Sequence, residues 1–405
     1  MKPIVRAGRM KPVHSDIRGP LFVEAMKRQK QGIDILKLNT GNPATFGFGL
    51  PDSIKNALME HMQDGVGYCD FKGMPQARQA ICDYETSKGI KGITPDDVFI
   101  GNGVSEVVSF ALTPLLNDED EVLVPSPSYS LWGNSVYLED GKPVFYTCDE
   151  QANWYPDIKD IRSKITDKTK AIVIINPNNP TGVLYPKELL LEIIQIARES
   201  GLLIFADEIY DRLVMDGKQH ISLASLTEDV PVITLNGLSK SHCLCGYRCG
   251  WMVISGPREL TEDYRQGIIQ LTSLRLCANT LAQIVIPAAL DDMETPASMV
   301  RPGGRIYEQR EATVRELEKI DGLSFVKNDA AFYVFPKLDV KKFNITNDKQ
   351  FAHDLLDATN ILLVPGSGFD WKDPDHFRIV MLPQADILSD AIRRMGTFLD
   401  GYKQK

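Results

Sequence analysis

The sequence has few cysteines, no long apolar run and no excess of positive charge. Its seven cysteines among 405 residues are an odd and sparse number, which favours reduced thiols in a cytoplasmic protein over a disulfide framework. No apolar run approaches the ~20 residues that a membrane helix requires, and the polar start of the chain leads into no apolar signal segment. With 54 acidic and 45 basic residues, the net charge is −9. We therefore expect a cytoplasmic protein with neither nucleic acid nor membrane as a partner.

Common phosphate and metal signatures are also missing. The chain contains no G-x-x-x-x-G-K-[ST] motif, and in residues 101–106 (GNGVSE) Glu106 occupies the third glycine position of G-x-G-x-x-G. A P-loop is therefore excluded, and a dinucleotide site is disfavoured. Cys243, Cys245 and Cys249 have the spacing C-x-C-x3-C, which matches no standard metal site. We expect them to be small packing residues and expect no metal.

The pattern of apolar segments predicts an α/β fold. The composition, 43% hydrophobic and 24% charged, is that of a globular protein. Strand-like apolar segments alternate with helical ones, at residues 97–101, 121–124, 170–175, 202–206 and 230–235. Strands that are apolar throughout indicate a mostly parallel sheet covered by helices on both faces. We expect a large domain at residues 50–290, and a smaller α+β domain formed by residues 1–49 together with 291–405.

Four polar segments stand at or just after predicted strands, where ligands of such sheets bind. They are residues 101–106 (GNGVSE), 176–182 (NPNNPTG), 207–210 (DEIY) and 239–248 (SKSHCLCGYR). The first can bind an anion at a helix start, or it is a plain turn capped by Ser105. Asp207 ends a buried strand and needs a cationic partner, such as a protonated ring nitrogen or an internal salt bridge; Glu208 could be the solvated one. A partly dry Lys240 would have a lowered pKa and could form a Schiff base.

Together these four segments resemble the fold-type I aminotransferases, which use pyridoxal 5′-phosphate (PLP). In order, they read G-x-G-x-x-E, N-P-x-N-P-T-G, D-E-x-Y and S-K-x-x-x-x-x-G-x-R. Residues 16–20, 38–48, 275–279, 302–310 and 377–383 match as well, so the resemblance extends over nearly the whole chain and is greatest to bacterial alanine (glutamate–pyruvate) aminotransferases. It implies the fold-type I architecture and reversible amino transfer between L-alanine and 2-oxoglutarate, giving pyruvate and L-glutamate.

The resemblance also implies roles for individual residues. Lys240 would bind PLP as a Schiff base and then move a proton, Asp207 would keep the pyridine nitrogen protonated, and Tyr129 would stack on the ring unless it is an ordinary core tyrosine. Asn179 and Tyr210 would donate to the ring oxygen. The phosphate would be held by the backbone amides of Val104 and Ser105, by Ser239 and Arg248, and by Tyr68 of a neighbouring subunit, so a homodimer with shared active sites is expected. The substrate carboxylates would meet Arg378, Asn179, the backbone of Gly41 and, as a second sensor, Arg18.

Three departures from the family leave the substrate open. Ser15 stands where relatives have an aromatic residue, Ser130 where they have a proline, and residues 241–247 carry cysteines in place of arginine and small apolar residues. The sequence therefore does not distinguish alanine from valine, 2-aminobutyrate or other amino donors. A valine–pyruvate or broad-range aminotransferase remains an alternative, followed by a PLP lyase of the same fold and a non-catalytic PLP-binding regulator.

Overall fold

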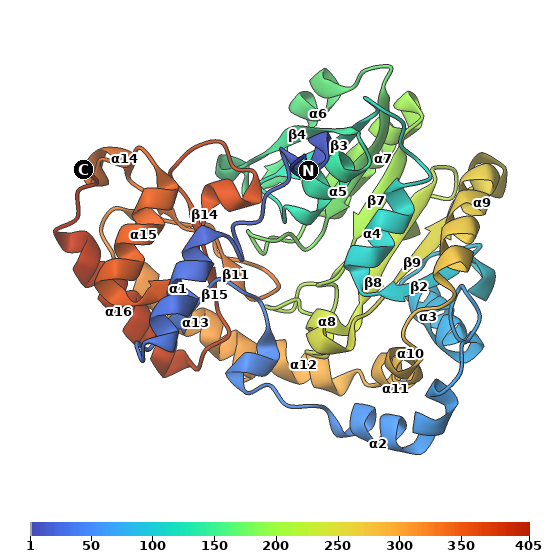
Figure 1. Cartoon of the computed structure of the whole chain (residues 1–405), viewed down its shortest axis with the longest axis horizontal. Coiled ribbons are helices and arrows are strands. Elements are labelled where there is room, and N and C mark those ends of the chain that lie inside the picture. The colour runs from blue at the N-terminus through green and yellow to red at the C-terminus, as the bar shows by residue number, and fades with distance from the viewer. Residues whose placement is uncertain (1) are drawn as a thin grey trace.

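A large mixed sheet forms the centre of the molecule. A computed structural model describes residues 2–405, and its eight-stranded sheet occupies the larger lobe (Figure 1). The strands, in spatial order, are β2 (Val98–Asn102), β9 (Cys249–Ser255), β8 (Val232–Gly237), β7 (Leu203–Asp207), β6 (Thr169–Ile175), β3 (Glu121–Ser126), β4 (Lys142–Asp149) and β5 (Tyr155–Pro156). Only β9 and β5 run antiparallel to their neighbours, so the expectation of a mostly parallel sheet is confirmed.

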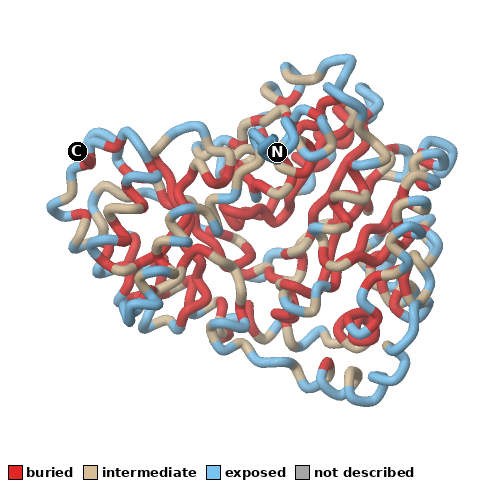
Figure 2. Tube along the Cα trace, in the orientation of Figure 1, coloured by how far each residue is buried: buried red, intermediate tan, exposed pale blue. Residues whose placement is uncertain are grey.

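Helices cover both faces of this sheet because its strands are apolar on both sides. Along β6, Ile172 and Ile174 face one core, whereas Val173 and Ile175 face the other. Figure 2 shows the buried strands enclosed by helices whose outer sides are exposed. The first face is covered by α6 (Ile158–Lys164) and α7 (Lys187–Ser200), and near β2 by α2 (Asp52–His61), α3 (Pro75–Ser87), α10 (Thr280–Ile284) and α11 (Ile286–Asp291). The second face is covered by α4 (Val104–Leu112), α5 (Leu131–Leu138) and α9 (Arg258–Arg275).

The smaller lobe is built from the two ends of the chain (Figure 1). Its strands are short: β1 (Leu36–Lys37) pairs with β13 (Ile361–Leu362), β10 (Leu323–Ser324) with β12 (Lys337–Leu338), and β15 (Phe377–Val380) lies between β11 (Tyr333–Val334) and β14 (Val364–Pro365). Its helices are α1 (Pro20–Lys30), α12 (Glu294–Val300), α13 (Arg305–Leu317), α14 (Val340–Phe343), α15 (Asp348–Thr359) and α16 (Ala385–Asp400).

The N-terminal segment contacts both lobes. Its strand β1 pairs with β13 of the smaller lobe, whereas the 3-10 turn η1 (Gly8–Met10) packs on α5 of the larger one. The backbone of His14 makes two hydrogen bonds with the Asn134 side chain on α5, at 3.0 and 2.6 Å. Division of the chain at about residues 50 and 290 therefore remains a proposal. None of the helices within residues 2–405 combines the length and apolarity needed to span a membrane.

Candidate active site

One edge of the large sheet collects all four sequence segments. The parallel strands β2, β3, β6, β7 and β8 end at this edge, and antiparallel β9 begins there. Residues 176–182 follow β6, Asp207 ends β7, and Lys240 follows β8 in the short helix α8 (Leu238–Ser241). Arg248 immediately precedes β9, which the sequence pattern did not identify as a reversed strand. The strand ends thus bring together side chains that are far apart along the chain.

Asp207 is a buried carboxylate with few donors. Its side chain accepts hydrogen bonds from the indole nitrogen of Trp132 at 3.1 Å and from the amide of Ile209 at 3.3 Å. Burial raises the pKa of Asp207 to about 6, against the hydrogen bonds and the charge of Lys240, which lower it. A carboxylate has about four acceptor positions, so Asp207 has capacity for a cationic donor. Trp132, on α5, was not singled out from the sequence.

Lys240 lies against the N-terminal segment. Its Nζ donates to the carbonyl oxygen of Gly41 at 2.9 Å and lies 5.9 Å from the centre of the Phe332 ring. The expectation of a lowered pKa is wrong for this arrangement: burial lowers the pKa of Lys240, but Tyr333 and Cys245 act in the other direction, and the pKa lies above its ordinary value. The chain by itself therefore keeps this amine protonated.

Arg378 is a buried cation without an acidic partner. The side chain, on β15, is only 1% exposed, and burial lowers its pKa from the ordinary arginine value. It donates to Asn179 Oδ1 at 2.9 Å and to the carbonyl of Asn39, and its Nε has no partner among residues 2–405. Within that described chain no carboxylate forms an ion pair with it. A buried charge of this kind needs an anion.

Aromatic side chains enclose the guanidinium of Arg378. The rings of Tyr333 and Phe369 each lie 4.6 Å from it. The hydroxyl of Tyr333 is 2.9 Å from that of Tyr210, and a Cβ added at Gly41 would stand 2.2 Å from the same hydroxyl. Gly41 is therefore required for the close approach of the N-terminal segment. Tyr333 was not singled out from the sequence.

The start of α4 forms an open, positively polarised corner. Val104 and Ser105 are its first two residues, so their amides have no partner inside the helix. The N-cap is Gly103, with φ of 83° and no capping side chain, so the alternative that Ser105 caps the turn is wrong. Arg248 lies over Gly103, where an added Cβ would be 2.3 Å from its Nη2. Buried Ser239 precedes Lys240 at the neighbouring strand end.

Glu106, which replaces the third glycine, fixes this corner. Its carboxylate accepts from the backbone and side-chain nitrogens of Asn102 at 2.8 and 3.0 Å. It also pairs with Arg275 at 2.6 Å. Arg275 in turn donates to the carbonyl of Phe71 at 3.1 Å, which holds the segment that follows Tyr68. The role of Arg275 could not be read from the sequence, where it stands far from every other segment of the site.

Three predicted residues lie at the margin of the site. Tyr129 is partly exposed and lies close enough to Lys240 and Arg378 to influence the pKa of each. Tyr68 is 83% exposed. Arg18 is exposed, and no hydrogen bond or ion pair joins it to the rest of residues 2–405. The structure therefore brings Tyr129 to the site and leaves Tyr68 and Arg18 facing outward.

Glu208 is buried, so the expectation that it is solvated is wrong. It pairs with Lys88 of α3 at 2.9 Å, and the same ammonium contacts Asp211 at 3.2 Å and Glu85 at 2.6 Å. The Glu208 side chain also accepts from Ser222 at 2.9 Å. In the sequence, Glu208 follows Asp207 and Asp211 follows Tyr210. Their ion pairs with Lys88 therefore anchor the loop that carries Asp207 and Tyr210.

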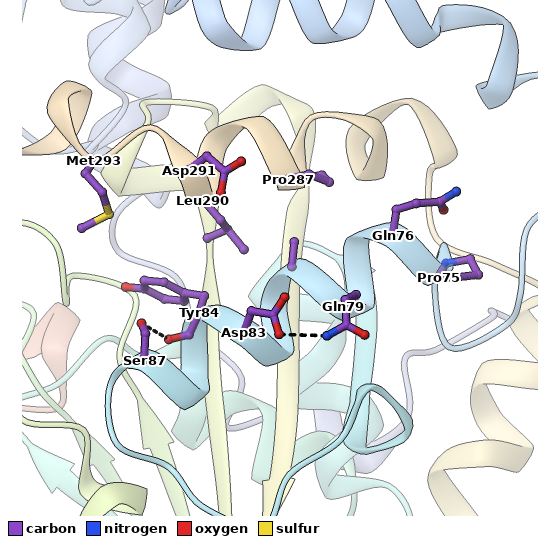
Figure 3. A pocket seen from close by; sticks show the side chains of 11 residues that line it. Pro75, Gln76, Gln79, Asp83, Tyr84, Ser87, Pro287, Leu290, Asp291 and Met293 are labelled. Carbon is purple, nitrogen blue, oxygen red and sulfur yellow. Dashed lines mark hydrogen bonds between the residues drawn. The ribbon is translucent and has the colours of Figure 1, made fainter.

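A groove between α3 and α11 is separate from this site. Its volume is about 800 Å³, and Figure 3 shows Tyr84 and Asp83 facing Leu290 and Asp291 across it. None of the residues that the sequence singled out lines it.

Two of the cysteines that depart from the family pattern make local contacts. The Cys245 thiol donates to the Ser239 carbonyl at 2.9 Å, and the Cys243 thiol lies 3.9 Å from the sulfur of Met299.

Comparison with known proteins gives the family. The model of the family "aminotransferase class I and II" matches residues 33–392. The glutamate-pyruvate aminotransferase AlaA of Haemophilus influenzae is 50% identical over 404 residues, which cover 100% of both chains, and the alanine aminotransferase of Mycobacterium tuberculosis is 44% identical, covering 100% of this chain and 94% of that protein. A crystal structure of an aminotransferase from Escherichia coli, 47% identical, covers 100% of both chains with a TM-score of 0.98. The chain therefore belongs to the aminotransferase class I and II family.

Proposed function

We propose that this aminotransferase uses PLP to transfer an amino group reversibly between L-alanine and 2-oxoglutarate. The observation that carries the proposal is a pair of buried charges near Lys240: Arg378 without an acid, and Asp207 with two donors. Relatives named glutamate-pyruvate and alanine aminotransferase at 44–50% identity support the choice of substrates.

The residues of the site fit the cofactor. Asp207 has unused acceptor capacity in a buried setting, which suits a protonated ring nitrogen. The amides of Val104 and Ser105, with Ser239 and Arg248, form a corner of donors suited to a phosphate. Asn179 and Tyr210 would donate to the ring oxygen, and Tyr129 would lie against the ring face. When bound, PLP supplies an electron sink for the bond broken at the substrate Cα.

The chain's own groups then orient the substrate and move its proton. Arg378 would bind the α-carboxylate with two parallel hydrogen bonds, beside Asn179 and the backbone of Gly41. The Lys240 amine would act as the acid–base group that takes up and returns the proton of the substrate Cα. Such a positioned acid–base group contributes roughly 10²–10⁴-fold to the rate. Arg18 would meet the second carboxylate of glutamate, so Arg18→Gln should raise the KM for 2-oxoglutarate without raising that for alanine.

We further propose a homodimer in which Tyr68 completes the partner's site. Several apolar side chains in the segments near Tyr68 and at the ends of α9 and α10 are exposed: Met59, Met62, Val66, Leu274, Leu276 and Leu281. They lie on adjoining elements, because the turn η3 (Met62–Gly65) packs on α10 and Thr280 donates to the Gly65 carbonyl at 2.7 Å. Exposed apolar patches of this kind mark protein interfaces. Mixing inactive Lys240→Ala and Tyr68→Ala proteins should restore turnover if the sites are shared, and no recovery after exchange of subunits would contradict it.

A donor panel tests the substrate. Initial rates with alanine, valine, 2-aminobutyrate and aspartate should be measured with 2-oxoglutarate and with pyruvate as acceptors. We expect alanine with 2-oxoglutarate to give the highest kcat/KM. A preference for valine with pyruvate, or release of ammonia in place of glutamate, would identify one of the alternative reactions.

A further inference from the structure

Two cysteines face each other at the anion-binding corner and have no part in the mechanism above. Cys69 follows Tyr68, and Cys277 lies in the loop between α9 and α10. Both thiols are free and partly buried. They belong to segments that are more than 200 positions apart in the sequence, so only the fold brings them together.

The side chain of Gln283 joins the two segments. Its Nε2 donates to the Cys69 sulfur at 3.4 Å and to the carbonyl of Ala278, next to Cys277, at 3.0 Å. The Cys277 thiol is a side-chain hydrogen-bond neighbour of the Cys69 thiol, and this contact contributes to the raised pKa of Cys69. Arg275 adds a second link, since it donates to the Phe71 carbonyl at 3.1 Å. The pair is therefore held in contact by two independent tethers.

We propose that Cys69 and Cys277 are a redox modification site, at which a hydroperoxide produces a reversible intrachain disulfide. One thiolate attacks the peroxide oxygen, which breaks the O–O bond, releases an alcohol and leaves a sulfenic acid. The second thiol then attacks that sulfur, the S–S bond forms, and water leaves. In balance, the two thiols lose two electrons and two protons, and the hydroperoxide is reduced to an alcohol and water.

The surroundings divide the two steps between the thiols. Burial raises the pKa of Cys69, and the neighbouring thiol adds to the effect, so Cys69 is a poor first nucleophile. We assign the first attack to Cys277 and the closing step to Cys69.

The disulfide would act on the corner that holds the phosphate. Asn279, two residues after Cys277, donates its amide to Asn102 at 2.9 Å, and Tyr68 adjoins Cys69. A covalent bond draws the two sulfurs closer than thiols in contact, so both segments must shift. A displacement of about 1 Å in a positioned site can cost on the order of 100-fold. This consequence, unlike the disulfide itself, rests on the proposed PLP function.

Peptide mapping tests the disulfide without using activity. The reduced full chain is treated with tert-butyl hydroperoxide, digested without reductant and analysed by mass spectrometry. We expect a peptide that joins Cys69 to Cys277 within one chain, lost on reduction with dithiothreitol and absent from Cys69→Ser and Cys277→Ser. Cys82→Ser is the matched control, because Cys82 lies on α3, outside the two segments that carry Cys69 and Cys277. It should form the link as the unaltered chain does. A link between two chains, or only sulfinic acid at either cysteine, would overturn the proposal.

A second measurement isolates the effect on the site. Cofactor retention after dialysis and kcat/KM are compared for oxidised and reduced protein and for Cys277→Ser under the same oxidant. We expect a ten- to hundredfold loss in the unaltered chain, reversed by dithiothreitol, with Cys277→Ser protected. If the peptide forms but retention and rate do not change, the disulfide stands and its link to the site is wrong. If no protein binds PLP at all, the proposed function fails, while the peptide map is unaffected.

Discussion

The two ends of the site are built in different ways. The end that contains Asp207 and Arg378 is buried, and its groups are positioned by side chains of the same chain, such as Trp132 and Asn179. The other end, where α4 starts, is open: Arg248 and Ser105 are exposed, and Tyr68 points away from the body of the chain. The buried end is therefore complete in one chain, whereas the open end depends on a ligand and a partner. Substitutions at the first should damage chemistry, and those at the second should damage retention of the cofactor.

Among the substitutions that compare the two ends, the largest effect is expected from Asp207→Asn. Loss of the carboxylate charge removes the group that would hold a proton on the ring nitrogen, so kcat should fall by roughly 10²–10⁴-fold while the cofactor stays bound. Steady-state rates and the visible absorbance of the protein measure the two effects separately. Asp229→Asn, at an exposed carboxylate paired with Arg198, is the control and should leave both unchanged. If Asp207→Asn instead lost the cofactor and showed a normal kcat once PLP was added back, Asp207 would serve cofactor retention and the contrast between the two ends would be wrong.

Arg378→Gln should have the next largest effect. Removing one member of a buried, hydrogen-bonded charge pair costs about 2–5 kcal/mol, so kcat/KM should fall for every amino acid, chiefly through KM. The cofactor should remain bound, because the open end is intact. Substrate saturation curves for alanine and glutamate measure the change. An unchanged KM would show that the α-carboxylate binds elsewhere.

At the open end, Tyr68→Phe should weaken the cofactor and not the chemistry. The lost hydrogen bond to a charged group is worth about 1.5–3 kcal/mol, which is roughly ten- to a hundredfold in the Kd for PLP. Titration of the apoprotein by fluorescence measures it, and saturating PLP should restore most of kcat. Tyr137→Phe, on α5, is the matched control. A fall in kcat that excess PLP does not correct would show that Tyr68 contributes to the chemistry and not only to cofactor binding.

The smallest effect concerns the N-terminal segment that connects the lobes. Hydrogen bonds to Asp16 and Asp370 raise the pKa of His14 from 6.5 to about 9. The charged form is favoured by folding, so its stabilisation is complete below pH 6.5 and is lost as the pH rises through 9. His14→Gln should lower the Tm by about 1 °C at pH 6 and by less at pH 10. Equal shifts at both pH values, or a shift as large in the exposed control His61→Gln, would contradict this origin.

The sequence was informative where a local pattern decides the geometry. Asp207 and Lys240 each follow an apolar strand, and parallel strands end at one edge, so a run of a few residues was enough to place them together.

Residues that meet only through long-range packing were not predictable. Tyr333 and Asn39 contact Arg378 because the N-terminal segment returns to the smaller lobe. Arg275 reaches Glu106 across 169 positions. Antiparallel β9 has the same apolar pattern as a parallel strand, so its direction could not be read. Pairings of this kind depend on which elements pack together, and spacing along the chain does not contain that information.

The most direct measurement locates the cofactor on the chain. The purified protein is incubated with PLP, reduced with sodium borohydride, digested and mapped by mass spectrometry, with Lys240→Ala and, at an exposed lysine, Lys91→Arg treated alongside. The account predicts a visible absorbance band that reduction removes, a single modified residue at Lys240, no label and almost no turnover in Lys240→Ala, and normal labelling in Lys91→Arg. A colourless protein, or a label on another lysine with transamination intact, would contradict it.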